Sequence, residues 1–398
     1  MAAADPYNYL GKIDKIVGLM VESIGPATTV GELCKIHAPD GSGFIGAEVV
    51  GFRDNRVLLM PYEDLVGIAP GSLVEGTKTK LKIPVSDALI GRTIDALGRP
   101  IDGGPDFEGV ARYEVESSYS NPLARPRIDT PMTFGIKAID GLLTIGKGQR
   151  MGIFAGSGVG KSTLMGMIAR NVHADVNVIA LVGERGREVK EFIERDLGEE
   201  GMRRSVVVVA TSDQPAMLRL KCAMAATAVA EYFRDQGKDV LLMMDNLTRF
   251  AMAQREIGLA SGEPPVARGY TPSMYTAMPK LLERTGNFET GSITGIYAVL
   301  VEGDDTNEPI SDTVRGIIDG HIILSRKIAA RNHYPAIDVL GSISRLMNDI
   351  VPRDQIDAAN RMRNIMAVHE SNYDLISIGA YKKGANPALD KAIAKIDG

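Results

Sequence analysis

The sequence has no tryptophan, only two cysteines and no long apolar run, and these shortages exclude several classes of protein. Cys34 and Cys222 lie far apart in the chain, so there is neither a disulfide framework nor a paired Cys/His zinc spacing. No stretch approaches the roughly 18 apolar residues of a membrane-spanning helix, and the N-terminal MAAADPYNYLGK lacks the apolar core of a signal peptide. These features predict a cytoplasmic protein.

Basic residues are not in excess either. The net charge is −5, and no aromatic-basic nucleic-acid module is recognisable. We therefore expect no nucleic-acid partner. A chain of 398 residues is nevertheless long enough for two or three domains.

The first 85 residues contain short segments rich in Val, Ile and Leu, separated by turn residues such as Pro39-Asp40-Gly41 and Arg53-Asp54-Asn55. The segments are Ile16–Ser23, Glu32–His37, Gly46–Phe52 and Arg56–Met60. This spacing predicts a small N-terminal β-barrel over residues 1–85. Residues 86–131, rich in Gly, Pro and Asp, are predicted to be a connector with some local structure.

Between residues 132 and 351, apolar runs of four to eight residues alternate with longer helical segments. The runs are Met151–Ala155, Val178–Val182, Val206–Ala210, Val240–Met244, Ile296–Val301 and His321–Leu324. Such runs predict an α/β core with a mainly parallel sheet covered by helices on both faces. Apolar and small residues recur at helical spacing along Asp354–Ser371, which predicts a C-terminal helical region over 352–398.

A phosphate-binding loop is predicted at residues 155–163, AGSGVGKST, between an apolar strand and a helix. Its glycines let backbone amides turn toward phosphate oxygens, and the helix N-terminus favours anions. Lys161 can reach the terminal phosphates, and the Ser162 hydroxyl can ligate Mg²⁺. The first position is Ala155 where the pattern has Gly. The order strand, loop, Lys-Ser and helix disfavours a plain glycine-rich turn, so we expect Mg-ATP to bind.

Two carboxylates follow later strands. Asp245 ends DVLLMMD, where a P-loop fold has an acid that holds Mg²⁺ through water. Glu184 lies in VGERGRE, where it could polarise the attacking water while Arg185 contacts phosphate. For Asp245 the alternative is a turn or cap residue. For Glu184 and Arg185 it is a solvated charged cap on a helix at 187–197.

Two further candidates lie downstream. Tyr334, beside Pro335, offers a flat face for stacking on adenine, or is a partly buried surface aromatic. Arg345, which follows Ser342-Ile343-Ser344, is an arginine finger or a helix-capping cation.

Taken together, the P-loop, DALGRPIDG, GERGREV, DVLLMMDNLTRFA and YPAIDVLGSISR resemble the catalytic subunits of rotary-type hexameric ATPases nearly end to end. Within that group the chain is most similar to the type III export ATPases. RFAMAQREIGLA has the form of the flagellar branch, whereas the virulence-injectisome branch tends toward RYARAAREIGLA. The resemblance implies a RecA-like P-loop core between a barrel and a C-terminal helical domain.

The resemblance also implies roles for single residues. The ATP phosphates go to the loop residues Gly156, Ser157, Gly158, Val159, Gly160, Lys161, Ser162 and Thr163. Three residues would serve the metal: Ser162 supplies its hydroxyl to Mg²⁺, Asp245 is the Walker B acid and Glu188 is a carboxylate near the metal. Glu184 is the carboxylate that activates water, and Arg185 contacts the γ-phosphate. Tyr334 stacks on adenine, and Arg345 inserts into the site of the neighbouring subunit. A homohexameric ring with active sites between subunits follows.

The partners implied are regulatory stator and stalk proteins, complexes of export chaperones with their substrates, and a membrane export gate. The gate would be contacted peripherally at the cytoplasmic face of the inner membrane. The family commonly has an amphipathic helix before the barrel and a longer C-terminal domain. Since only about ten residues precede the barrel here, we expect trimming at one or both ends.

Other functions remain open. An injectisome export ATPase and a rotary ATPase or synthase ring subunit share the same motifs. A non-catalytic ring subunit would resemble Gln at the position of Glu184, and a nucleic-acid translocase is disfavoured by the acidic charge. Residues 258–273, GLASGEPPVARGYTPS, are a pore loop or a surface connection.

Overall fold

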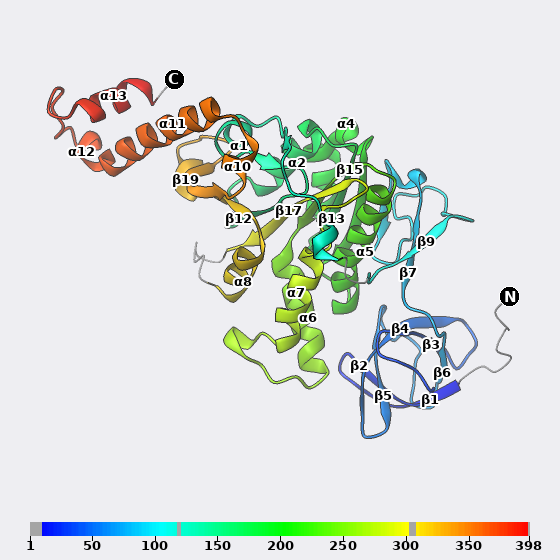
Figure 1. The fold of residues 1–398 in the computed structure, drawn as a ribbon. Coiled ribbons are helices and arrows are strands. Elements are labelled where there is room, and N and C mark those ends of the chain that lie inside the picture. The colour runs from blue at the N-terminus through cyan, green and yellow to red at the C-terminus, as the bar shows by residue number, and fades with distance from the viewer. Residues whose placement is uncertain (1–9, 118–120, 302–307, 397–398) are drawn as a thin grey trace.

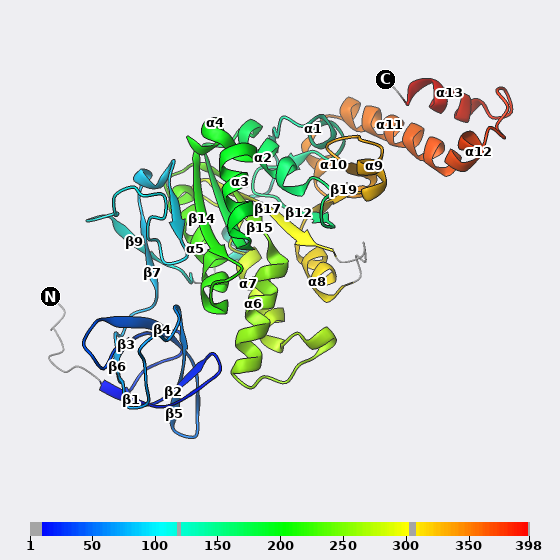
Figure 2. The ribbon, with the colours of Figure 1, turned by 180° about the vertical axis from the view of Figure 1, so that it is seen from behind.

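The chain is arranged as a row of three parts: a barrel at one end, a helix-covered sheet in the middle and a helical arm at the other end (Figures 1 and 2). The computed structural model describes residues 10–117, 121–301 and 308–396. The absence of an amphipathic helix before the barrel was predicted for residues that lie mostly outside these ranges. Within them, none of the helices combines the length and the apolar character needed to cross a bilayer.

Six strands close the N-terminal barrel in the order β1-β2-β5-β4-β3-β6. They are β1 Leu10–Val17, β2 Met20–Ile24, β3 Leu33–His37, β4 Phe44–Arg53, β5 Arg56–Pro61 and β6 Leu73–Gly76. The single strand predicted over Ile16–Ser23 is wrong, because the chain reverses at Gly18, whose φ of +58° suits a tight turn. The unpredicted β6 pairs with both β1 and β3 and so closes the barrel. The predicted barrel fold is confirmed.

The stretch predicted as a connector contains short strands and single helical turns. β7 Lys82–Val85 pairs with β9 Ala111–Glu114, and the short β8 Thr93–Asp95 lies parallel to β14 at the edge of the central sheet. The remaining elements of this stretch are η1 Asp87–Leu89, η2 Pro122–Ala124 and β10 Pro131–Met132. The barrel is therefore joined to the central sheet through a strand of that sheet.

The central sheet has the strand order β19-β18-β12-β17-β15-β13-β14-β8, with β16 paired to β17. Its main strands are β12 Arg150–Ala155, β13 Val176–Glu184, β14 Ser205–Thr211, β15 Asp239–Asp245, β17 Ser292–Leu300, β18 Gly320–Leu324 and β19 Ile337–Ser344. The short pieces are β11 Ile145–Gly146, which pairs with β10, and β16 Gly286–Asn287. Only β16–β17 and β18–β19 are antiparallel within this sheet. The prediction of a mainly parallel sheet is confirmed.

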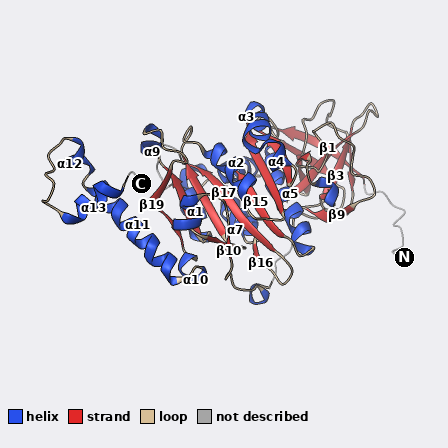
Figure 3. Cartoon of the chain, turned by 90° about the horizontal axis from the view of Figure 1, so that it is seen from above, coloured by secondary structure: helices blue, strands red, loops and turns tan. Residues whose placement is uncertain are grey.

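Helices cover both faces of this sheet (Figure 3). Along β13, Val178, Ala180 and Val182 pack with α5, α6 and α7 on one face, and Ile179 and Leu181 pack with α1 and α2 on the other. The helices are α1 Lys137–Leu142, α2 Lys161–Asn171, α3 Gly186–Glu191, α4 Gly198–Met202, α5 Ala216–Asp235, α6 Leu247–Ala260, α7 Pro272–Leu282, α8 Pro309–Ile317, α9 Arg326–Ala330 and α10 Met347–Ile350. Burial on both faces explains why these strands read as continuous apolar runs.

Two predicted segments lie at the margins of the core. The helix predicted at 187–197 is α3 continued by a π-helical segment, η3 Phe192–Leu197. Residues 261–271 join α6 to α7 and include η4 Ala267–Gly269; the carbonyl of Ser261 accepts a hydrogen bond from Arg53 of the barrel. This contact does not distinguish a pore loop from a surface connection, and both stay predictions.

The predicted C-terminal helical region consists of α11 Arg353–Ser371, α12 Tyr373–Ser377 and α13 Pro387–Lys395. Ile356 and Ala359 are the buried residues of α11, so only its first turns are buried. The rest of the region extends away from the sheet as an arm (Figure 1).

A buried lysine links the barrel to the core. Lys221 of α5 is 1% exposed, and its ammonium lies 2.7 Å from Glu48 of β4 and 2.6 Å from Glu116. The Tyr62 hydroxyl also donates to the Glu48 carboxylate, at 2.7 Å. Burial alone would lower the pKa of Lys221, but the two carboxylates raise it above its ordinary value. The barrel is thus held to α5 by a charge cluster around a buried ammonium.

Replacing Lys221 by Met should lower the free energy of unfolding by about 3–5 kcal/mol, because two carboxylates then lose their buried counter-charge. The thermal unfolding midpoint of the purified protein measures this. Lys190→Met is the matched control. It removes an exposed lysine paired with Glu194 at 3.7 Å and should cost less than about 1 kcal/mol. Equal midpoints for the two variants would contradict this account of the cluster.

Candidate active site

The phosphate-binding loop connects β12 to α2. Ala155 ends the buried strand, and Gly158 and Gly160 have φ values of +79° and +90°, which side chains other than glycine rarely adopt. Gly160 is the N-cap of α2, and Lys161 is the first residue of that helix. The sequence therefore forms the predicted strand, glycine loop and helix, with amide groups and a helix N-terminus at one point.

The Lys161 ammonium, largely buried, lies between the two predicted carboxylates. It forms an ion pair with Asp245 at the end of β15, and its Nζ is 3.7 Å from Oε1 of Glu184 at the end of β13. Burial lowers the pKa of Lys161, but the charges of Asp245 and Glu184 outweigh this and raise it. Three residues predicted as one site are thus brought together by three separate strands.

Glu184 is the most perturbed acid of this group. Burial raises its pKa, the neighbouring Asp245 charge raises it further, and the result is a pKa of about 7. Asn246, the N-cap of α6, donates its amide Nδ2 to Glu184 Oε1 at 2.6 Å. A carboxyl group with this pKa exchanges protons near neutral pH, as a general base requires.

Arg185 and Glu188 lie at the rim. Arg185 is an exposed N-cap of α3, and its Nη1 donates to Glu188 Oε1 at 2.7 Å. Although burial acts in the opposite direction, hydrogen bonds from Glu184 and Arg185 lower the pKa of Glu188. Glu188 lines a small pocket together with Ser162, Glu184 and Asp245. Arg185 is not among the residues that line this pocket, and it is joined to them through Glu188.

Tyr334 lies against the loop although it is 179 residues further along the chain than Ala155. A Cβ atom built on Gly160 would be 3.4 Å from both Cδ1 and Cε1 of the tyrosine ring. The ring is otherwise 56% exposed, so one face is open beside the phosphate-binding loop. This position suits a base stacked next to bound phosphates.

Arg345 is the predicted site residue that the fold keeps away from the others. It follows Ser344, the last residue of β19, which pairs with Gly320 of β18. The next residue of β18, His321, pairs with Gly152 near the start of β12, so Arg345 lies at the level where β12 begins. The loop begins after the opposite end of β12, roughly 16 Å away at about 3.3 Å per residue. Arg345 is exposed and cannot complete the site of its own chain.

Asn246 was not predicted as a site residue. It follows Asp245 directly and was visible only as part of DNLTRFA. Its contact with Glu184 joins residues 62 positions apart, which a local pattern does not reveal.

The oxygen ligands fit a magnesium ion shared with phosphate. Ser162 and Asp245 line the same pocket, and Mg²⁺ typically uses one or two protein oxygens beside waters and substrate phosphates. Across residues 10–117, 121–301 and 308–396, no cluster of three or more His, Cys, Asp or Glu side chains could hold a metal alone. A site of this kind would bind the ion with its nucleotide.

The raised pKa of Glu184 predicts a pH-dependent stability. The nucleotide-free folded protein keeps a proton on Glu184 up to about pH 7, whereas the unfolded chain releases it near its ordinary pKa of 4.5. Folding is therefore penalised progressively as pH rises between these values. Glu184→Gln should raise the unfolding midpoint at pH 8 and leave it nearly unchanged at pH 4.5. Glu191→Gln, an exposed change on α3, should show no such difference. A Glu184→Gln effect equal at both pH values would contradict the raised pKa.

Models of known protein families match the barrel, the central sheet domain and the helical arm separately. The nucleotide-binding domain of the ATP synthase alpha/beta family matches residues 135–344, its beta-barrel domain matches 13–78, and the T3SS EscN ATPase C-terminal domain matches 351–398. The Flagellum-specific ATP synthase of Bacillus subtilis (strain 168) is 58% identical over 98% of this chain and 89% of its own length. The Type 3 secretion system ATPase of Xanthomonas euvesicatoria is 51% identical over 97% and 88%.

Two solved structures have the same fold. The assembled ATPase EscN of the enteropathogenic E. coli type III secretion system has a TM-score of 0.91 at 47% identity, covering 97% of this chain and 93% of EscN. EscN in complex with its central stalk EscO has a TM-score of 0.89 at 45% identity, with the same coverage. The resemblance seen in the motifs is thereby confirmed. The chain belongs to the ATP synthase alpha/beta family, in the group of flagellum-specific ATP synthases and type 3 secretion system ATPases.

Proposed function

We propose that this chain is a Mg-ATP hydrolase that energises protein export through the flagellar type III secretion apparatus. One observation carries the catalytic part. A carboxyl group with a pKa of about 7, Glu184, lies 3.7 Å from the Lys161 ammonium at the mouth of a phosphate-binding loop. A site that only bound nucleotide would not need this acid.

Residues of the loop hold the substrate. The amides of Gly156 to Thr163 surround the phosphates, and the ATP base stacks on Tyr334. On binding, the Lys161 ammonium exchanges Asp245 for phosphate oxygens and neutralises their charge. Magnesium, held by Ser162 and through water by Asp245 with Glu188 nearby, would neutralise further phosphate charge.

Glu184 then acts on water. Its carboxylate accepts a hydrogen bond from the water that attacks the γ-phosphorus, and takes the proton as the bond to the leaving ADP oxygen breaks. Asn246 keeps the carboxylate in place through its 2.6 Å hydrogen bond. Arg185, paired with Glu188 at the edge of the pocket, would contact the γ-phosphate, and Glu188 would lie near the metal.

The remaining cation comes from a second copy of the chain. Since Arg345 lies at the opposite edge of its own sheet, we assign it to the site of a neighbouring subunit, where it stabilises charge on the γ-phosphate. Active sites between subunits imply a closed ring, and a hexamer is the ring we propose. The assembled form of EscN, which shares the fold, supports assembly.

The sequence identities to known relatives favour flagellar protein export as the process that ATP hydrolysis drives. The flagellum-specific relative is 58% identical, against 51% for a type 3 secretion relative, so injectisome export is the second candidate. The complex of EscN with a central stalk supports a stalk partner here. Stator proteins, chaperone–substrate complexes and a membrane export gate complete the partners, with the ring at the cytoplasmic face of the inner membrane.

Glu184→Gln tests hydrolysis against simple binding. The variant should bind ATP with near-normal affinity, since the loop and Lys161 are intact, and should release phosphate about 10²–10⁴ times more slowly. Phosphate release and the dissociation constant for a fluorescent nucleotide are the measurements. Unchanged phosphate release would remove Glu184 from the mechanism.

Arg345→Ala tests the shared site. Nucleotide affinity should stay within about threefold, and turnover in the assembled ring should fall by about 10³ or more. Assembly is checked by sedimentation under the conditions of the assay. Near-normal turnover by assembled Arg345→Ala rings would refute a site between subunits.

A further inference from the structure

Arg345 follows a strand end that is held by a buried polar network at the amino edge of the sheet. We propose that Gln149 and Ser344 are positioning residues for Arg345: they set the direction in which this arginine leaves the subunit. The inference rests on the proposed function, because it assumes that Arg345 acts in a neighbouring site. It adds residues that touch neither nucleotide nor metal.

Gln149, directly before β12, is fully buried and its amide has a defined orientation. Its Oε1 accepts a hydrogen bond from the Gly146 amide at 2.8 Å, which only an oxygen can do. The Nε2 group therefore points the other way. It donates to Ser344 Oγ at 3.1 Å and to the carbonyl of Asp319 at 3.2 Å.

Both acceptors lead directly to Arg345. Ser344 is the preceding residue, and its hydroxyl donates to the Thr144 carbonyl at 2.7 Å. The Asp319 carbonyl that Gln149 contacts also accepts the Arg345 backbone amide at 3.0 Å. The Gln149 side-chain amide thus binds both the Ser344 hydroxyl and the Asp319 carbonyl, and that carbonyl also accepts the Arg345 backbone amide.

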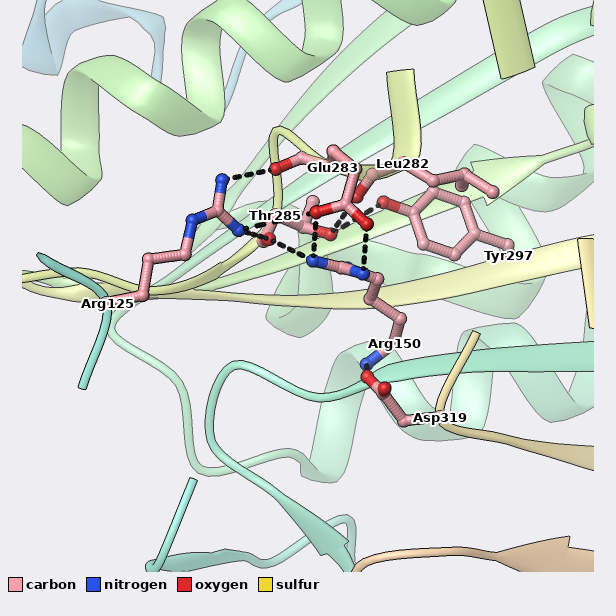
Figure 4. A network of polar contacts seen from close by, with 7 residues as sticks. All are labelled: Arg125, Arg150, Leu282, Glu283, Thr285, Tyr297 and Asp319. Carbon is pink, nitrogen blue, oxygen red and sulfur yellow. Dashed lines mark hydrogen bonds and ion pairs between the residues drawn. The ribbon is translucent and has the colours of Figure 1, made fainter. Parts of the chain in front are cut away.

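The base of this network is itself anchored. Figure 4 shows the Asp319 carboxylate accepting the backbone amide of Arg150, at 3.0 Å. The Arg150 guanidinium makes two parallel 2.9 Å hydrogen bonds with Glu283, and Arg125 donates to the Glu283 carbonyl on the other side. A bidentate pair of this kind restricts rotation about both side chains. Asp319 therefore connects the start of β12, through the Arg150 amide, to the end of β19, through the Arg345 amide.

The Arg345 side chain has little support of its own. Among the described residues, its guanidinium donates one long hydrogen bond, 3.3 Å to the carbonyl of Arg315, and the residue is exposed. Its direction is then set mainly by its backbone. Because a misplacement of about 1 Å at a reacting centre can cost roughly 10²-fold in rate, a hydrogen bond that fixes this backbone affects turnover.

The experiment separates positioning from general stability. Ser344→Ala removes the hydroxyl that links Gln149 to Thr144 and should lower kcat of the assembled ring about tenfold, with KM for ATP within twofold. Ser344→Thr keeps a hydroxyl and should restore most of kcat. Ser342→Ala is the matched control on the same strand. It also loses two hydrogen bonds, to Asp338 and Ile323, but none leads to Arg345, and it should keep kcat.

The decisive measurement combines each change with Arg345→Ala. A positioning residue acts only through the residue it positions, so Ser344→Ala should change the single-turnover rate less than twofold in the Arg345→Ala background. Gln149→Met, which keeps the side-chain volume but lacks the amide, should behave likewise, with a 10- to 100-fold loss when Arg345 is present. Radiolabelled ATP makes the low residual rates measurable.

The outcomes distinguish the two levels of the proposal. Equal losses with and without Arg345, no loss in either variant, or an equal loss in Ser342→Ala would overturn the positioning role and leave the proposed function intact. Wild-type turnover by Arg345→Ala would instead overturn the shared site, and the positioning role with it. A loss of kcat that depends on Arg345 and is reversed by Ser344→Thr would establish the role.

Discussion

The parallel arrangement of β12, β17, β15 and β13 in one sheet is the constraint on which the site depends. In a parallel sheet every strand ends at the same edge, so the loop after Ala155, the Glu184 carboxyl and the Asp245 carboxyl meet without any long-range design of side chains. In the register between β13 and β15, Leu181 lies level with Asp245. Glu184 therefore extends beyond Asp245 and lines the same pocket as Asp245 and Ser162.

Bringing the Asp245 and Glu184 carboxyl groups together lowers the stability of the folded protein, and the effect falls on Glu184. Lys161 neutralises Asp245 and Glu184 only in part, so burial and repulsion raise the pKa of Glu184 to about 7. The folded protein holds a group that an unfolded chain would ionise freely. Sites of catalysis commonly keep such a penalty, because the perturbed group is the one that moves the proton.

Features encoded within a few residues could be predicted from the sequence. The glycine loop, Lys161, Ser162 and the strand ending in Asp245 are local patterns, and the structure has them where expected. Contacts between distant segments could not be predicted. Lys221 contacts Glu48, which is 173 residues away in the chain, and β6 closes the barrel by pairing with β1. β8 is too short to be recognised in the sequence, and only its pairing with β14 identifies it as a strand. Gln149 is part of an unremarkable turn until Ser344, 195 residues later, is placed beside it.

The antiparallel pairing of β19 with β18 gives the molecule its second functional edge. A parallel strand would have ended beside the loop, and an arginine after it could have served its own chain. Because β19 runs the other way, Ser344 pairs with Gly320 at the amino edge, and the exposed Arg345 follows it there. β12 connects both edges, since Gln149 precedes it and the phosphate-binding loop follows it. A shift of β12 on nucleotide binding would thus also reach the strand end that carries Arg345, the arginine that we propose acts in a neighbouring subunit.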